Sequence, residues 1–285
     1  MTIDIDMKHT QHAVRETIIA GHTILRRIMM SHPREQERRK PKRNPTKESV
    51  QKNNDRIAIR KAVALINANF FPGDYHVTLT YRGEPPEQEK AKKDMDNFVR
   101  RMKREYEKLG REFRYFQVTE YKQKRIHHHI VMSYIDESII RGQWKEGYVR
   151  FSVLDTDRNY AKLAEYLIKE TSKTFRDPEN ATRRRWRASK NLIRPVVKRE
   201  IVSTKQLFED PKPLAGYYID KESVRRYEHP FTELEHLEYI MVSEDPVPRI
   251  DKWRKGKVVR KDESYRRIQE LEHETDGILS AWSIL

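Results

Sequence analysis

Two β-type stretches in the middle of the chain constrain the fold most. Residues 113–121 and 126–134 are rich in aromatic and β-branched side chains, and the polar segment 122–125 joins them. This pattern predicts an antiparallel hairpin closed by a four-residue loop. In that register Glu120 faces His127, and directly opposed residues lie on the same face of a sheet.

The second stretch begins with three consecutive histidines, His127, His128 and His129. Side chains alternate along a strand, so His127 and His129 share a face with Glu120, and His128 points the other way. Two imidazoles and one carboxylate form a three-ligand set with open positions, as catalytic metal sites require. Such a set suits Mg²⁺ or Mn²⁺, and also zinc, nickel or cobalt in vitro. The alternative is that the histidines only stabilise the hairpin or contact nucleic acid as polar groups, and a register slip of one residue would remove Glu120 from the set.

A second candidate group lies on a predicted helix over residues 159–171. Tyr166 lies off the apolar stripe of this helix, and Lys169 follows one turn later on the same face. A phenol near a divalent cation can act as a nucleophile, and a lysine can hold a phosphate and offset charge on a leaving oxygen. The alternative is ordinary surface packing of Tyr166 and Lys169. The stripe itself consists of Tyr160, Leu163, Ala164, Leu167 and Ile168.

The remaining pattern predicts an α+β fold with a mostly antiparallel sheet flanked by helices. Expected helices cover 8–32, 49–69, 86–109 and 139–144, and expected strands cover 75–81, 148–154 and 195–202. We expect a helical and basic extension with a linker over 1–48, a main domain over 49–202, and a C-terminal extension over 203–285 with a charged helix near 264–274.

The charge balance indicates a polyanionic partner. The chain carries 59 Lys and Arg against 44 Asp and Glu, a formal net charge of +15. The densest basic cluster has one aromatic within it, a composition typical of single-strand binders that track phosphates and stack bases. The alternative places Trp186 in the core and leaves the arginines solvated. The candidate DNA-binding residues are Arg183, Arg184, Arg185, Trp186, Arg187 and Lys190, with residues 34–43 as a further candidate.

The chain contains no cysteine, which excludes disulfides, thiolate zinc sites and cysteine nucleophiles. It has no apolar run long enough to span a bilayer, and its acidic N-terminus does not resemble a signal peptide. We therefore expect a cytoplasmic protein without a membrane partner. It also has no phosphate-binding Gly-x-x-x-x-Gly-Lys motif of the kind that an ATP-driven helicase needs.

Three motifs together resemble a known family. Residues 77–81 (Val-Thr-Leu-Thr-Tyr), 127–131 (His-His-His-Ile-Val) and 166–169 (Tyr-Leu-Ile-Lys) are similar, in order and spacing, to the three motifs of HUH-type rolling-circle replication initiators. Bacterial rolling-circle replication-associated proteins of plasmids, phages and integrated elements are the most similar group. The second motif departs from the family pattern, because His128 stands where a hydrophobic residue is usual.

The resemblance implies a five-stranded antiparallel sheet related to the RNA-recognition fold. It implies a divalent metal held by Glu120, His127 and His129, and Tyr166 as the single catalytic tyrosine, because Tyr160 lies on the apolar stripe. The implied function is site-specific nicking and joining of single-stranded DNA at a replication origin through a 5′-phosphotyrosine link. Host helicase and polymerase would be partners, and the protein could oligomerise. The alternatives are a relaxase or transposase of the same superfamily, or a DNA-binding regulator without catalytic activity.

Overall fold

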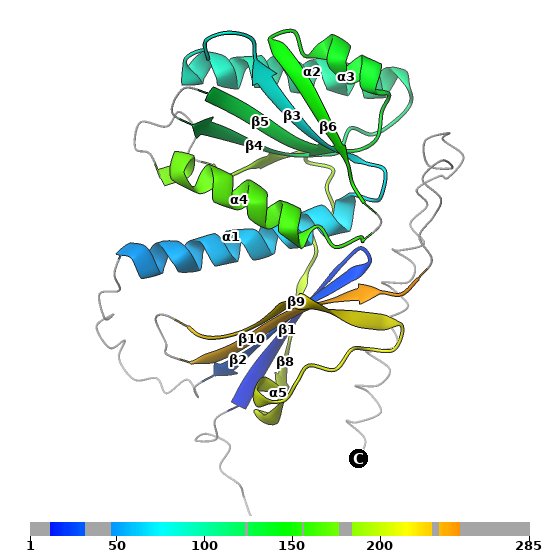
Figure 1. The fold of residues 1–285 in the computed structure, drawn as a ribbon. Helices are drawn as coiled ribbons and strands as arrows, with labels where there is room; N and C mark the ends of the chain where they lie inside the picture. Colours follow the sequence, from blue (N-terminus) through cyan, green and yellow to red (C-terminus); the bar gives the residue numbers. More distant parts are fainter. Residues whose placement is uncertain are drawn as a thin grey trace, which may run out of the picture. The chain divides into compact units, whose positions relative to one another are not determined.

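The computed structural model describes residues 12–31, 47–122, 125–155, 157–176, 184–229 and 234–245. Within these ranges the chain forms two five-stranded sheets, and every strand pair is antiparallel (Figure 1). The predicted α+β class with antiparallel pairing is therefore confirmed. None of the described helices combines the length and the apolar character that a membrane span requires.

The first sheet has the strand order β6-β3-β5-β4-β7 and carries the histidine motif. Its strands are β3 (Tyr75–Tyr81), β4 (Tyr115–Lys122), β5 (Arg125–Met132), β6 (Gly147–Val153) and β7 (Arg187–Ala188). The second sheet has the order β8-β1-β2-β10-β9. Its strands are β1 (His12–Ala20), β2 (Thr23–Ser31), β8 (Val197–Val202), β9 (Tyr217–Glu228) and β10 (Glu235–Ser243).

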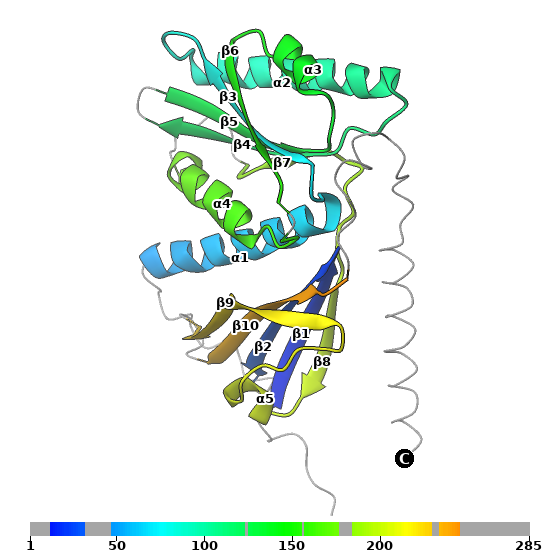
Figure 2. The ribbon, with the colours of Figure 1, turned by 45° about the vertical axis from the view of Figure 1, so that its right-hand side comes forward.

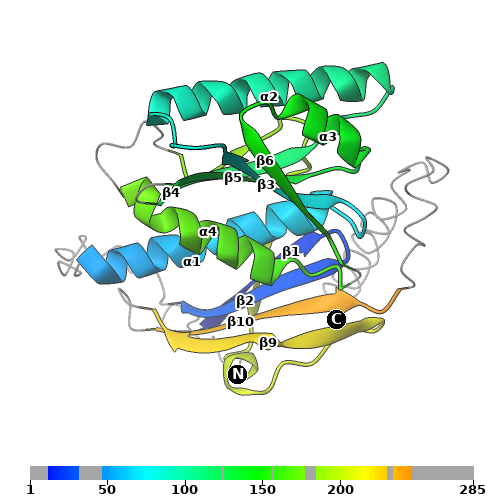
Figure 3. The same cartoon turned by 45° about the horizontal axis from the view of Figure 1, so that its top comes forward.

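Helices separate and cover the two sheets. The helices are α1 (Lys47–Asn69), α2 (Gln88–Lys108), α3 (Glu137–Gln143), α4 (Ala161–Arg176) and α5 (Lys205–Phe208). Helices α2 and α3 cover one face of the first sheet, whereas α1 and α4 lie between the sheets, as Figures 2 and 3 show from two further directions. Helix α5 packs on the other face of the second sheet. The histidine-bearing sheet is therefore covered differently on its two faces.

The predicted helix over residues 8–32 is wrong. The described part of this segment forms the antiparallel hairpin β1–β2, which turns at Gly21 with a φ of +58°. The second sheet has apolar neighbours on both faces, because Ile18 and Leu25 face the helices while Ala13 and Ile28 belong to the cluster that contains α5. A strand that is apolar on both faces loses the alternation that distinguishes it from a helix.

The extensions therefore differ from the expected helical ones. Residues 197–202 do form a strand, but this strand pairs with β1 in the second sheet and not with the histidine-bearing sheet. The described part of the C-terminal extension contains the strands β9 and β10 and the four-residue helix α5. The charged helix expected near 264–274 and the basic segment 34–43 lie outside the described residues. The boundaries of a main domain at 49–202 remain a prediction.

The elements around the histidine motif agree with the sequence. Helix α1, strand β3, helix α2 and the β4–β5 hairpin lie within a few residues of their predicted bounds. Helix α2 places Met95, Phe98, Met102 and Tyr106 against the first sheet, at the spacing of one helix face. Gly110, with a φ of +61°, follows the end of this helix.

Candidate active site

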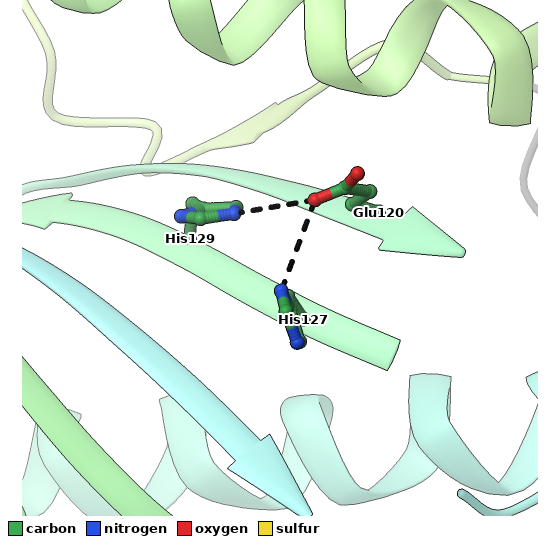
Figure 4. A group of neighbouring side chains, drawn as sticks. All are labelled: Glu120, His127 and His129. Carbon is green, nitrogen blue, oxygen red and sulfur yellow. Dashed lines mark ion pairs between the residues drawn. The ribbon is translucent and has the colours of Figure 1, made fainter. Parts of the chain in front are cut away.

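The β4–β5 hairpin brings the three predicted metal ligands together. Glu120 pairs with His127 in the register of the hairpin, as the loop length predicts, and His129 lies two residues further along the same face. Glu120 Oε2 lies 3.9 Å from His127 Nδ1 and 3.7 Å from His129 Nε2 (Figure 4). One potential ligand atom from each residue falls within 4.8 Å of the others. The predicted grouping of Glu120, His127 and His129 is confirmed.

These three residues fit a divalent cation by the chemistry of their donors. Glu120 and His129 are buried, and the His127 side chain is 31% exposed. Two neutral imidazoles and a carboxylate can hold a cation and leave coordination positions free on the exposed side. This donor set agrees with Mg²⁺ or Mn²⁺ and also with softer divalent ions. The group can therefore hold a metal ion whose identity stays open.

His76 and Thr78 of β3 orient His129 from behind, and the sequence interpretation missed this role. His76 Nε2 lies 3.2 Å and Thr78 Oγ1 lies 3.3 Å from His129 Nδ1. If His129 offers Nε2 to a metal, then Nδ1 carries the proton and donates it to these neighbours. Burial lowers the pKa of His76 to about 4, so His76 is neutral near pH 7 and can accept. Alternation along β3 was the signal available, since it places His76 and Thr78 on one face.

His128 points to the opposite face and is fully buried. Thr119 Oγ1 lies 2.9 Å from its Nδ1, and the Tyr81 hydroxyl lies 3.1 Å from its Nε2. Burial lowers the pKa of His128 to about 3, which keeps the ring neutral. Two hydrogen bonds thus explain how a histidine occupies a position where the related family usually has a hydrophobic residue.

Helix α4 carries Tyr166 to the metal-ligand group. The apolar stripe is buried as predicted, with Ala164, Leu167 and Ile168 in the core. Tyr166 lies off this stripe and is 44% exposed. Its ring centroid lies 5.7 Å from that of His129 in an edge-to-face arrangement and 6.5 Å from that of His76. A phenol and a candidate metal group therefore share one site.

Lys169 also lies on the exposed side of α4, where its Nζ is 2.7 Å from Glu165 Oε1. Arg225 of β9 reaches the other oxygen of Glu165 at 3.2 Å. The Lys169 ion pair lowers the pKa of Glu165, together with Arg225 and against the effect of burial. Glu165 thus holds two cations beside the tyrosine. Tyr160, the other tyrosine of the motif, is buried, and burial raises its pKa further from neutrality.

The basic segment is mostly held by the protein itself. Arg185 forms an ion pair with Asp55, and Arg187 forms one with Asp96. The Trp186 ring stacks on Phe116 with centroids 5.7 Å apart and packs against the core between the sheets. Arg184 and Lys190 are exposed, and Arg183 lies outside the described residues. A role of this segment in DNA binding remains a prediction, with Arg184 and Lys190 as its most accessible cations.

Comparison with known families agrees with this site. Residues 74–175 match the family model of replication-associated proteins of the ORF2 type. The matched segment contains all three predicted metal ligands, Tyr166 and Lys169. The match confirms the resemblance to phage and plasmid rolling-circle replication initiators that the three motifs indicate. No curated protein and no solved structure matches the chain.

Proposed function

We propose that the protein is a metal-dependent endonuclease that nicks and joins single-stranded DNA at a replication origin, and that it thereby initiates rolling-circle replication of a plasmid, phage or mobile element. The observation that carries this proposal is the position of the Tyr166 ring beside His129 within a buried Glu-His-His group. The family match of residues 74–175 supports a replication role. The HUH-type fold is part of the same proposal.

Tyr166 is the proposed nucleophile. Its oxygen attacks the scissile phosphorus in line, and a new phosphorus–oxygen bond forms as the bond to the 3′ oxygen breaks. The phenolic proton is lost, and the leaving 3′ oxygen gains a proton and becomes a free 3′-hydroxyl. The products are a 5′-phosphotyrosine link and a 3′ end that a polymerase can extend. Attack by that hydroxyl reverses the step and joins the ends, so ATP is not needed.

Glu120, His127 and His129 would hold the cation, and a bound divalent ion supplies charge that polarises the scissile phosphate. His76 and Thr78 hold the His129 ring in the tautomer that directs Nε2 toward Glu120. Lys169 is proposed to contact a phosphate and to offset charge on the leaving oxygen. Its ion pair with Glu165 keeps the ammonium on the same side of α4 as Tyr166 until DNA binds.

The covalent link provides the decisive test. A pool of single-stranded oligonucleotides labelled at the 3′ end, incubated with Mg²⁺ or Mn²⁺, should yield labelled protein that survives denaturing electrophoresis. Tyr166→Phe should lose this adduct while keeping DNA affinity, because only the nucleophilic oxygen is removed. Tyr160→Phe is the matched control and should still form the adduct. A labelled adduct on Tyr166→Phe would contradict the assignment of the nucleophile.

Metal dependence is tested in the same assay. EDTA, or His129→Ala, should abolish adduct formation, because either change removes the cation. Full activity in EDTA would contradict the metal role. A regulator without catalytic activity would bind the oligonucleotides and form no adduct under any of these conditions. A relaxase or transposase would form the adduct, and the DNA sequence it selects would separate these activities from replication.

A further inference from the structure

We propose that the open edge of the metal-bearing sheet face, formed by β3 and β6, is a platform on which one base of the single strand stacks against Tyr148. This inference rests on the proposed function, because it places a nucleotide that flanks the cleaved phosphate. It adds a positioning residue, Tyr148, which lies outside the three family motifs. The exposed cations around this ring would hold the neighbouring phosphates.

The register of the sheet places Tyr148 in one row with two of the metal ligands. Thr80 of β3 pairs with Tyr148 on one side and with His127 on the other, and His127 pairs with Glu120. Directly opposed residues share a face, so Tyr148, Thr80, His127 and Glu120 all point to the face that carries the metal group. Neighbouring strands lie about 4.8 Å apart, so Tyr148 is two strands, or about 10 Å, from His127. That spacing is of the order of one or two nucleotides of an extended strand.

This edge of the face is uncovered. Tyr148, Arg150 and Ser152 alternate along β6 on the metal side, and all three are exposed. Val149 and Phe151 on the other side of β6 pack against the core under α2 and α3. Helix α4 lies along β4 and β5 instead (Figure 1). A polymer that enters the site can therefore lie across β3 and β6 without displacing any described element.

A pocket of about 300 Å³ links this platform to the metal group. Thr80, Arg125, His127 and Tyr148 are among its lining residues. The Tyr148 side of this pocket is fixed in place by the preceding residue, because a Cβ on Gly147 would lie 2.2 Å from the Thr80 carbonyl oxygen. Glycine there allows β6 to approach β3 closely at the point where Tyr148 leaves the strand.

The chemistry of the platform suits single-stranded nucleic acid. Tyr148 is 62% exposed, an uncommon state for a large ring that has only a structural role. The Arg82 guanidinium lies 5.6 Å from its centroid, and Arg125 and Arg150 are exposed nearby. Among the described residues, no ion pair neutralises Arg82 or Arg150. An accessible aromatic face with unneutralised cations around it is the combination that binds a base and its phosphates.

The test measures binding without chemistry. Fluorescence anisotropy in EDTA compares labelled (dT)₁₂ with an abasic strand of the same length and label. Tyr148→Ala should weaken (dT)₁₂ binding by about tenfold, because stacking of one base is lost, and should leave abasic binding unchanged. Tyr148→Phe keeps the ring and should retain the affinity of the native protein. Phe208→Ala, which removes a ring that is 65% exposed on α5, is the matched control and should change neither affinity.

Arg150→Gln separates phosphate contact from stacking. It should weaken binding of both strands and reduce the salt dependence of binding, because a phosphate contact carries no base information. Equal (dT)₁₂ affinity of Tyr148→Ala and the native protein would overturn the stacking role. So would an equal loss on the abasic strand.

A measurement on the native protein guards against a folding defect in Tyr148→Ala. An oligonucleotide with 5-iodouracil should crosslink on irradiation to the peptide that contains Tyr148, and crosslinks found only in other peptides would overturn the proposal. The outcome is separate from that of the nuclease proposal. Loss of stacking with normal adduct formation refutes only the platform, whereas stacking at Tyr148 with no adduct from the native protein refutes only the nuclease.

Discussion

At the scale of single residues, the site depends on the side chains behind the metal ligands. His129 is held on its Nδ1 side by His76 and Thr78 of the neighbouring strand. Such contacts set the tautomer and orientation of a ligand histidine before any cation binds. His76 is therefore a positioning residue, and its removal should affect metal binding without changing the ligand set.

We expect His76→Leu to weaken Mn²⁺ binding by about 10- to 100-fold, because the His129 ring loses the partner that fixes its tautomer. Isothermal titration calorimetry of the free protein measures this change. His76→Gln retains a hydrogen-bond acceptor and should restore part of the affinity. His229→Ala, on the second sheet, is the control. Unchanged Mn²⁺ affinity in His76→Leu would show that His129 needs no support from β3.

The three metal ligands could be predicted at this scale, whereas the environment of Trp186 could not. Strand alternation and the length of one loop determine which of Glu120, His127 and His129 share a face. A tryptophan among arginines has the same local sequence whether it stacks on a base or on Phe116. Only the packing of the basic segment against β4 distinguishes these two cases.

At the scale of elements, the turn between β1 and β2 is the feature that the sequence interpretation missed. Gly21 has a φ of +58°, and a Cβ at this position would lie 2.3 Å from the carbonyl oxygen of Asn67 at the end of α1. The hairpin can approach α1 closely only because residue 21 has no side chain. A glycine between two apolar runs was the available sign of a strand–turn–strand unit.

Gly21→Ala should destabilise the protein by about 1–3 kcal/mol, because it combines an unfavourable φ with a clash against backbone. Urea denaturation followed by circular dichroism measures the change in the free energy of unfolding. Gly142→Ala is the control, since a Cβ there meets no atom within 4 Å. Equal stability of Gly21→Ala and the native protein would mean that the hairpin does not seat against α1 as described.

At the scale of the whole molecule, one apolar core joins the two sheets. Side chains of β1, α1, α4 and β4 belong to a single buried cluster, with Ile18, Ile66, Leu167 and Phe116 among its members. The described residues fall within one contact unit, Met1–Asp245. We therefore expect both sheets to unfold in one cooperative transition.

Acid should destabilise this unit between about pH 6.5 and pH 4. Burial lowers the pKa of His236 to about 4, so the unfolded chain binds a proton in this window that the folded protein does not bind. Stability then falls as the pH is lowered, by about 1.4 kcal/mol per pH unit for each such histidine. His236→Leu should reduce this slope by about one histidine in denaturation curves measured at pH 7, 6 and 5. An unchanged slope would contradict burial of a neutral His236.

The sequence by itself determined the local chemistry of this protein. Period-two alternation, a four-residue loop and helical spacing are short-range properties, and they sufficed to group Glu120 with His127 and His129 and to keep Tyr166 off the apolar stripe of its helix. Tertiary structure decided the rest. The pairing of residues 197–202 with β1, the partner of Trp186 and the distance from Tyr166 to His129 depend on contacts between segments far apart in the chain. Such contacts are selected by the packing of whole faces, which no local pattern encodes.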